Sequence, residues 1–189
     1  LARYPEMAAV GFHLREPGLL HRLDTDTTGL LLAARNKAAF EALRAATAEE
    51  KLEKRYLALV EGRLAGDGVV ELPLIPHRKD PKRVEAVTEH VRIRAAVKPH
   101  AATTRWRVAS EVGEFTLLEV SLTRAFRHQV RAHLAAIGHP LVGDVLYRGP
   151  ALPADVAFEC DADILTPLGP RDRAWLEAVA EGGARGADA

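Results

Sequence analysis

Cysteine is almost absent from the chain, because Cys160 is the only one among 189 residues. A single thiol excludes an internal disulfide, so we expect a protein of a reducing compartment, the cytoplasm. No apolar run approaches the roughly 20 residues that a membrane helix requires. Residues 1–5 show no basic segment followed by an apolar one, as a signal peptide would. With 48% apolar and 28% charged residues, the composition is that of a soluble globular protein.

The chain also lacks a net charge, because its 26 lysines and arginines balance its 26 aspartates and glutamates. This balance taken alone argues against a nucleic-acid partner. The distribution is uneven, however, because residues 150–189 hold eight acids and three arginines, which leaves a net charge of +5 on residues 1–149. A local basic surface can bind phosphate groups even on a neutral molecule.

Two stretches concentrate the positive charge. Residues 77–94 contain six lysines and arginines against three acids, and residues 120–143 contain no acid at all. From the first stretch we expect Lys79, Lys82 and Arg83 to contact phosphates. A solvated charged surface without a ligand is the simpler interpretation of either stretch.

The pattern of apolar residues predicts an α+β domain built on a largely antiparallel sheet. Helices are expected at 37–48, where Asn36 can form the N-cap, and at 127–137, where Gly138 ends the helix. A third helix should begin at Pro170. Strands are expected at 29–35, 55–61, 69–74, 88–97, 103–110 and 115–123, the last two joined by a hairpin turn at 112–114.

The segment His21–Gly29, which enters the first expected strand, contains two carboxylates and an arginine. Asp24, close to Arg22, is expected to stay ionised and open to a ligand, as a nucleophile or a base must be. For an isolated segment, a polar turn that satisfies backbone amides is the simpler interpretation.

The same segment also matches the motif of a different class of enzyme. Asp24-x-Asp26-x-Thr28 matches the signature of haloacid dehalogenase-like phosphatases, in which both carboxylates help to hold magnesium. That family needs an apolar strand before the first aspartate, where this chain has His21-Arg22. It also needs a later acidic metal ligand, for which Asp144 is a candidate. A match of five residues carries little weight on its own.

Tyr56 follows two cations, Lys54 and Arg55, at the start of the strand expected at 55–61. An aromatic ring beside cations can stack on a base while the cations hold phosphate. An ordinary strand tyrosine is the alternative.

The helix expected at 127–137 carries Arg127 and Arg131 near its N-terminal end. Cations there oppose the helix dipole, at a cost of a few tenths of a kcal/mol each. An anion should therefore compensate them, either a phosphate or a carboxylate such as Asp24. His128 and His133 are five residues apart and do not share a helical face, so we expect no zinc site.

Taken together, three segments resemble the motifs of the RluA family of RNA pseudouridine synthases. His21-Arg22-Leu23-Asp24-x-x-Thr27-Thr28-Gly29 resembles the family's HRLDxxTSG motif. Lys54-Arg55-Tyr56-Leu57-Ala58-Leu59-Val60-x-Gly62 resembles its second motif. The third corresponds to His128-Gln129-Val130-Arg131-x-His133-Leu134 followed by Gly138-His139-Pro140-Leu141-x-Gly143-Asp144-x-x-Tyr147. Three motifs in the same order are far more specific than any one of them.

The resemblance implies roles for individual residues. Asp24 would be the catalytic aspartate, Tyr56 would lie against the target base and help in proton transfer, and Arg131 would pair with Asp24. Arg22 would enter the RNA stack in place of the extruded uridine. The RNA-binding residues that we expect are Arg22, Lys54, Arg55, Lys79, Lys82, Arg83, Arg127 and His128.

The resemblance also implies a fold and a substrate. Residues 1–189 would form a pseudouridine synthase catalytic domain, with a central antiparallel sheet, flanking helices and a cleft. We expect no S4-like domain, and part of the family's N-terminal strand region would be missing. The substrate would be ribosomal or transfer RNA, modified by a monomer without a cofactor, a metal or a membrane.

One local difference keeps an alternative open. Arg124-Ala125-Phe126 occupies the places where the family has Thr-Gly-Arg. A catalytically inactive RNA-binding relative is therefore the second hypothesis, and the magnesium phosphatase is the third.

Overall fold

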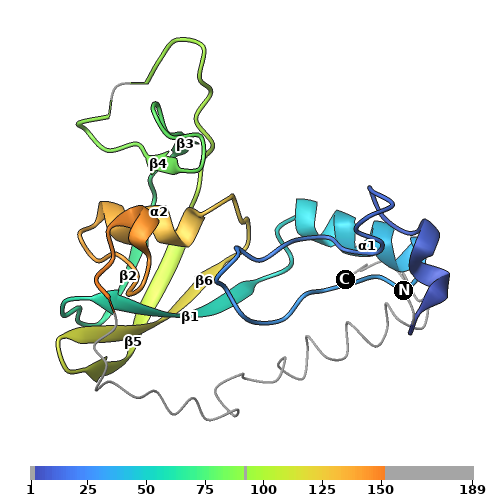
Figure 1. Cartoon of the computed structure of the whole chain (residues 1–189), viewed down its shortest axis with the longest axis horizontal. Coiled ribbons are helices and arrows are strands. Elements are labelled where there is room, and N and C mark those ends of the chain that lie inside the picture. Colours follow the sequence, from blue (N-terminus) through green and yellow to red (C-terminus); the bar gives the residue numbers. More distant parts are fainter. Residues whose placement is uncertain (1–2, 92, 152–189) are drawn as a thin grey trace, which may run out of the picture. The chain divides into compact units, whose positions relative to one another are not determined.

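The computed structural model describes residues 3–91 and 93–151, which divide into two compact units. Unit 1 comprises the described residues up to Lys51, and unit 2 begins at Leu52. In chain order the elements are η1 (Pro5–Ala9), α1 (Lys37–Ala48), β1 (Lys54–Glu61), β2 (Asp67–Val70), β3 (Leu74–Pro76), β4 (Val84–Ala86), β5 (Thr104–Val112), β6 (Phe115–Leu122), α2 (Gln129–Ala136) and η2 (Val145–Tyr147). They are shown in Figure 1. The mixture of helices with antiparallel strands confirms the α+β class.

Unit 1 is organised around α1, whose bounds agree with the predicted helix at 37–48. The Asn36 side chain accepts a hydrogen bond from the Ala39 N–H at 2.9 Å, which is the expected N-cap. Phe40 and Leu43 are buried on the inner face of the helix. The ring of Phe12 meets Phe40 edge to face, with the centroids 4.9 Å apart. Capping and an apolar stripe together therefore determine this helix.

The strand predicted at 29–35 is wrong. Within this segment the structure has only an isolated bridge, in which Ala33 pairs with Leu19. Leu30 is 79% exposed, although the prediction placed it in a buried strand. An apolar run becomes a strand only where a neighbouring strand completes its hydrogen-bond ladder, and composition cannot show whether such a neighbour exists.

Unit 2 contains a four-stranded antiparallel sheet with the order β1-β6-β5-β2. β1 and β6 pair without a register shift, from Lys54 opposite Leu122 to Glu61 opposite Phe115. β5 and β6 form a hairpin whose turn includes Gly113, at φ +60°. These findings confirm the strands predicted at 55–61, 103–110 and 115–123 and the turn between the last two.

The main core lies between this sheet and α2. Alternate residues of β6 are buried, and Leu118 and Val120 are almost fully inaccessible. They form one apolar cluster with Val60 of β1 and Leu134 of α2. α2 lies against this side of the sheet in Figure 1. Period-two burial in the strands and one apolar helix face thus produce a two-layer unit.

β2 packs closely against β5 at a single glycine. Gly68 pairs with Trp106, and a Cβ atom at Gly68 would lie 2.4 Å from Cζ2 of the indole. The extended segment predicted at 69–74 is interrupted, because β2 ends at Val70 and β3 begins at Leu74.

β3 and β4 form a separate two-stranded ribbon. β4 lies within residues 77–94, which we call the basic arm. The strand predicted at 88–97 is wrong, because the described residues of that range contain none. Leu74 already has a partner on each side, Ala86 of β4 and His100 beyond the arm. At Leu74 both sides of β3 are therefore occupied.

α2 confirms the helix predicted at 127–137 but starts two residues later. His128 has φ +53°, in the left-handed region, so it cannot belong to the helix and instead serves as its N-cap position. Gly138 follows the helix with φ +86°, as predicted for its end. The helix predicted from Pro170 lies outside the described residues. Within the described part of the chain, no helix has both the length and the apolar character needed to cross a bilayer.

Candidate active site

Asp24 lies in unit 1, in a loop held by its own backbone. The Thr27 N–H donates to the Asp24 carbonyl at 3.0 Å, which closes a turn over Thr25 and Asp26. His21 accepts a hydrogen bond at Nε2 from the Leu32 N–H at 3.0 Å, so the first residue of the motif is bound to the segment that follows the motif. Asp24 is half-buried, whereas Arg22 and Asp26 are exposed. The two aspartates therefore have different environments, and Asp24 is the more sheltered.

The structure gives no support to the phosphatase hypothesis. The residues before Asp24 form no strand beyond the single bridge at Leu19. The later acid, Asp144, is held by Arg131. Among the described residues, no group of three or more histidines, cysteines and acids is arranged to hold a metal ion.

Tyr56 lies in unit 2, on the face of β1 that packs against the core. It pairs with Val120 and contacts the main apolar cluster, but remains half-buried. Lys54, on the same face, is also half-buried, and this burial lowers the pKa of its amine. Arg55 points to the opposite face and forms an exposed ion pair with Glu53 at 2.6 Å. The strand period therefore separates Arg55 from the other two residues of the motif.

Arg131 is held by a two-point ion pair with Asp144. Its Nε and Nη2 donate to the two carboxylate oxygens at 2.6 and 2.8 Å. The side chains are only 20% and 7% exposed, respectively. Burial alone would raise the pKa of Asp144, but the Arg131 guanidinium outweighs burial and holds that pKa below its usual value. An anion was predicted to compensate the cations near this end of α2, and the Asp144 carboxylate does so for Arg131.

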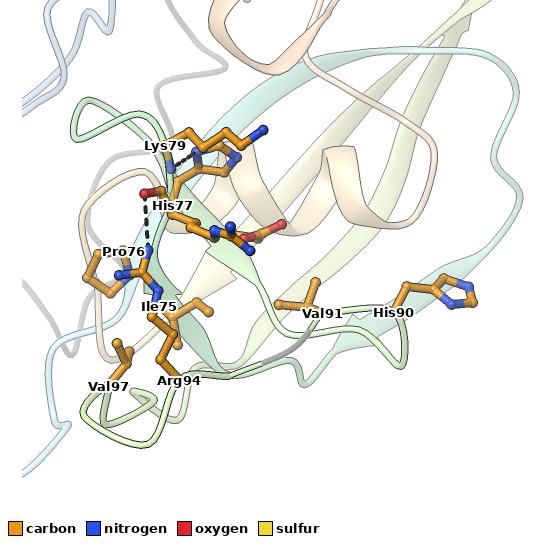
Figure 2. Close-up of a pocket in the computed structure, with 10 residues that line it drawn as sticks. Ile75, Pro76, His77, Lys79, His90, Val91, Arg94 and Val97 are labelled. Carbon is orange, nitrogen blue, oxygen red and sulfur yellow. Dashed lines mark hydrogen bonds between the residues drawn. The ribbon is translucent and has the colours of Figure 1, made fainter.

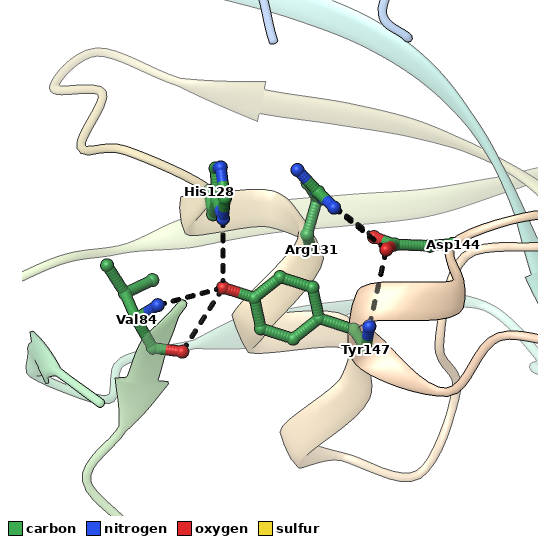
Figure 3. A network of polar contacts seen from close by, with 5 residues as sticks. All are labelled: Val84, His128, Arg131, Asp144 and Tyr147. Atoms are coloured by element: carbon green, nitrogen blue, oxygen red, sulfur yellow. Dashed lines mark hydrogen bonds and ion pairs between the residues drawn. The ribbon is translucent and has the colours of Figure 1, made fainter. Parts of the chain in front are cut away.

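Tyr147, three residues after Asp144, is the centre of the network in Figure 3. Its hydroxyl accepts from the Val84 N–H at 3.0 Å and donates to the Val84 carbonyl at 3.1 Å. Nδ1 of His128 lies 3.2 Å from the same oxygen. The ring is buried, and burial raises the pKa of Tyr147, so the phenol keeps its proton at neutral pH.

A second buried network fixes the other side of α2. Gln129 donates to the Thr104 hydroxyl at 3.1 Å, and Thr104 lies 2.8 Å from Nδ1 of His133. Nε2 of His133 lies 2.8 Å from the Leu72 carbonyl. Burial lowers the pKa of His133, which makes the neutral ring the stable form. A neutral ring satisfies both contacts if Nε2 carries the proton and Nδ1 accepts from Thr104.

The unusual loop before α2 is well anchored. The Phe126 N–H donates to the Gln129 side chain at 3.0 Å, and the Phe126 ring lies 5.0 Å from that of His100. Arg127, predicted to bind RNA, donates to the Pro81 carbonyl at 3.2 Å and the Lys82 carbonyl at 2.6 Å. The loop is thereby attached to the basic arm.

The basic arm presents its cations in two ways. Lys79 and Lys82 are exposed, whereas Arg83 is half-buried and stacks on the Tyr147 ring with Cζ 5.1 Å from the centroid. Beside them the surface is hollowed by about 610 Å³. Figure 2 shows this hollow, which is lined by Ile75, Pro76, His77, Arg78, Lys79, Glu85, His90, Val91, Arg94 and Val97.

Of the three expected catalytic residues, Tyr56 and Arg131 belong to unit 2, and Asp24 belongs to unit 1. That the three side chains meet around one uridine stays a prediction. From sequence, Asp144 was considered only as a metal ligand of the phosphatase hypothesis, and Tyr147 was given no role. Both belong to the third motif, so that motif was the signal that could have identified them.

The sequence model of the family described as RNA pseudouridylate synthase matches residues 10–136. An uncharacterised RNA pseudouridine synthase of Chloroflexus aurantiacus is 41% identical over 149 residues, which are 78% of this chain and 43% of that protein. Ribosomal large subunit pseudouridine synthase D of Nitrosomonas europaea is 41% identical over 130 residues, which are 69% of this chain and 35% of that protein. The chain thus spans about half the length, or less, of these curated relatives.

A solved structure shows the same fold. Human RNA Pseudouridylate Synthase Domain Containing 1 superimposes with a TM-score of 0.59 at 26% identity, over 71% of this chain and 57% of that one. The family model covers the first two motifs and the start of the third, on a fold that the human protein shares. The chain therefore belongs to the RluA family of RNA pseudouridine synthases.

Proposed function

We propose that this chain converts uridine to pseudouridine in RNA and that Asp24 is its essential carboxylate. The observation that carries the proposal is the His21–Gly29 motif, which lies within the part matched by the family and shelters Asp24 in a closed turn. Tyr56 lies against the uracil, and Arg131 orients Asp24. In this proposal residues 1–189 form one catalytic domain, which acts as a monomer in the cytoplasm.

The reaction explains why these residue types suffice. The N1–C1′ bond of uridine breaks, the uracil turns, and C5 bonds to C1′, while C5 loses a proton and N1 gains one. A stacked base must first be flipped out of the helix to be reached. The carboxylate can attack the sugar or the ring, or act as a base, and the phenol of Tyr56 can assist proton transfer. Because nothing is oxidised or hydrolysed, no cofactor is needed.

The relatives' names favour one class of RNA. Proteins from Nitrosomonas europaea, Zymomonas mobilis and Yersinia pestis are each named ribosomal large subunit pseudouridine synthase D. We therefore propose ribosomal RNA as the substrate, with transfer RNA as the alternative. The cations proposed to hold it include Arg22, Lys54, Arg55, Lys79, Lys82, Arg83, Arg127 and His128.

The decisive experiment is tritium release from RNA labelled at C5 of uridine. Asp24→Asn should reduce the release to background. Asp26→Asn is the matched control, since Asp26 is an exposed carboxylate in the same turn, and its activity should stay within about threefold of the parent. Full activity of Asp24→Asn would refute the role of this carboxylate.

The same assay separates the rivals. RNA binding by the parent protein without any tritium release would favour the inactive relative, whose motivation is the Arg124-Ala125-Phe126 loop. Hydrolysis of a generic phosphate ester that stops with EDTA would restore the phosphatase.

A further inference from the structure

The hydroxyl of Tyr147 occupies an open edge of the β3–β4 ribbon. Val84 of β4 lies opposite Pro76 of β3, which has no N–H. Leu74 lies opposite Ala86, but its backbone N–H and carbonyl form their hydrogen bonds with His100. In an antiparallel ladder this alternation turns the Val84 N–H and carbonyl away from β3. The Tyr147 hydroxyl binds both groups, at 3.0 and 3.1 Å, in place of a neighbouring strand. The arm is therefore attached to η2 through a single oxygen atom.

The ring of the same tyrosine contacts two guanidinium groups. Cζ of Arg83, from the basic arm, and Cζ of Arg131, from α2, each lie 5.1 Å from the ring centroid. Nε of Arg83 is buried without a hydrogen-bond partner, and the guanidinium is stabilised by stacking on Tyr147. A cation of the arm and the arginine expected to orient Asp24 thus share one aromatic ring.

A second connection lies close by. The Arg127 guanidinium, just before α2, donates to the carbonyls of Pro81 and Lys82 in the arm. Two side chains from the third motif region, Arg127 and Tyr147, therefore hold the arm at three of its residues. Such double attachment fixes both the distance and the orientation of the arm relative to α2.

We propose that Tyr147 is a positioning residue that keeps the basic arm in register with Arg131. The inference rests on the proposed function, because it assumes that the arm holds RNA phosphates while Arg131 acts at the uridine. With the arm fixed, an RNA bound through its backbone presents the flipped base at the reacting groups. A displacement of about 1 Å far from the chemistry can cost up to 10²-fold in rate.

The test is Tyr147→Phe, which keeps the ring for both arginines and removes only the hydroxyl. The rate of tritium release is measured in single turnover with enzyme in saturating excess over RNA. The single-turnover rate constant at saturating enzyme is called the plateau rate. Unfolding of part of the enzyme sample would not lower this plateau rate, because folded enzyme is still in excess. A lower plateau rate therefore reports a change in positioning. We expect a fall of about tenfold or more, with the RNA dissociation constant changed less than about threefold. Tyr4→Phe is the matched control, because the ring of Tyr4 also carries an arginine, Arg35 at 4.5 Å.

An independent readout separates the inference from the proposed function. The Val84 amide hydrogen should exchange slowly in the parent and much faster in Tyr147→Phe, whether or not the protein is active. If Val84 exchanges faster in Tyr147→Phe but the parent protein releases no tritium, the proposed function is refuted and the attachment of the arm by Tyr147 is not. Unchanged exchange, or an unchanged plateau rate, would overturn the positioning role.

A second variant covers the case in which Tyr147→Phe does not fold. Arg127→Gln removes the other attachment and leaves Tyr147 intact. If Arg127 positions the arm, the plateau rate falls at saturating enzyme. If it only contacts phosphate, affinity falls while the plateau rate stays, and the proposed coupling is refuted.

Discussion

The Arg131–Asp144 ion pair is well sheltered from solvent, with side chains 20% and 7% exposed. Buried pairs add little net stability, but removing one partner strands the other charge away from water. The two-point geometry also limits the rotation of the guanidinium. At the scale of single residues, Asp144 therefore determines where the Arg131 side chain can point.

We expect Asp144→Asn to lower the free energy of unfolding by about 2–3 kcal/mol, somewhat less than for a fully buried pair. Denaturant unfolding at pH 7 measures this. Glu41→Gln is the matched control, because Glu41 pairs with Arg44 at 2.7 Å but both are about half exposed. That change should cost less than about 0.5 kcal/mol. Equal costs for the two variants would contradict the burial argument.

The sequence predicts Asp24, Tyr56 and Arg131 as site residues because each stands inside a contiguous motif, and their catalytic roles stay predictions. The partners of Arg131 and Tyr147 were not predicted. Asp144 lies 13 residues from Arg131 within the same motif, whereas Val84 lies 63 residues from Tyr147 and outside all three motifs. The second pairing depends on how the chain folds back, which a local sequence pattern does not show.

At the scale of elements, His133 joins α2 to β5 and to the segment after β2. Burial lowers the pKa of His133, so the folded protein resists protonation there. Below the unfolded pKa of about 6.5, the unfolded chain binds a proton that folded His133 does not. The stability provided by the neutral ring is therefore complete above pH 6.5 and is lost as the pH falls toward the lowered pKa.

His133→Gln should remove this dependence. The stability difference between parent and variant should be largest at pH 7 and shrink toward pH 5, by at most about 1.4 kcal/mol per pH unit. Urea unfolding over this range measures it. His90→Gln, whose side chain is 86% exposed, is the matched control for a histidine-to-glutamine change at the surface. A parallel pair of curves for His133→Gln and the parent would contradict the neutral assignment.

The basic arm supports a prediction about salt. Lys79 and Lys82 are exposed, and each phosphate contact adds about 0.7–0.9 to the slope of log affinity against log salt. The double variant Lys79→Ala/Lys82→Ala should weaken RNA binding and flatten this slope by about 1.4–1.8. Lys37→Ala, at an exposed position of α1, is the control. Equal slopes for all three proteins would remove these lysines from the interface.

Elements were predictable where local signals agreed. Asn36 and Gly138 marked helix ends, and alternation identified β1, β5 and β6. The segments 29–35 and 88–97 failed as strands because pairing partners, not composition, decide whether a strand forms. β3 and β4 have three residues each, too few for a periodic pattern to be recognised.

At the scale of the whole molecule, the described chain has two units with unequal cores. Unit 2 has two clusters of buried apolar residues, centred on Leu118 and on Leu74. Unit 1 buries Phe40, Leu43 and Ala46 of α1, together with Val10 and Ala34. The expected site draws Asp24 from the smaller core and Tyr56 and Arg131 from the larger. The predicted catalytic role of these three residues therefore requires both units to be folded.

The close contact between Gly68 and Trp106 provides an optical reporter for unit 2. The sequence has two tryptophans, and Trp175 lies outside the described residues. In a Trp175→Phe protein the remaining indole rests on bare β2 backbone, with no side chain between them. When β2 separates from β5, water reaches that indole and its fluorescence emission shifts to longer wavelength. Detachment of this edge strand can thus be followed in real time without an added dye.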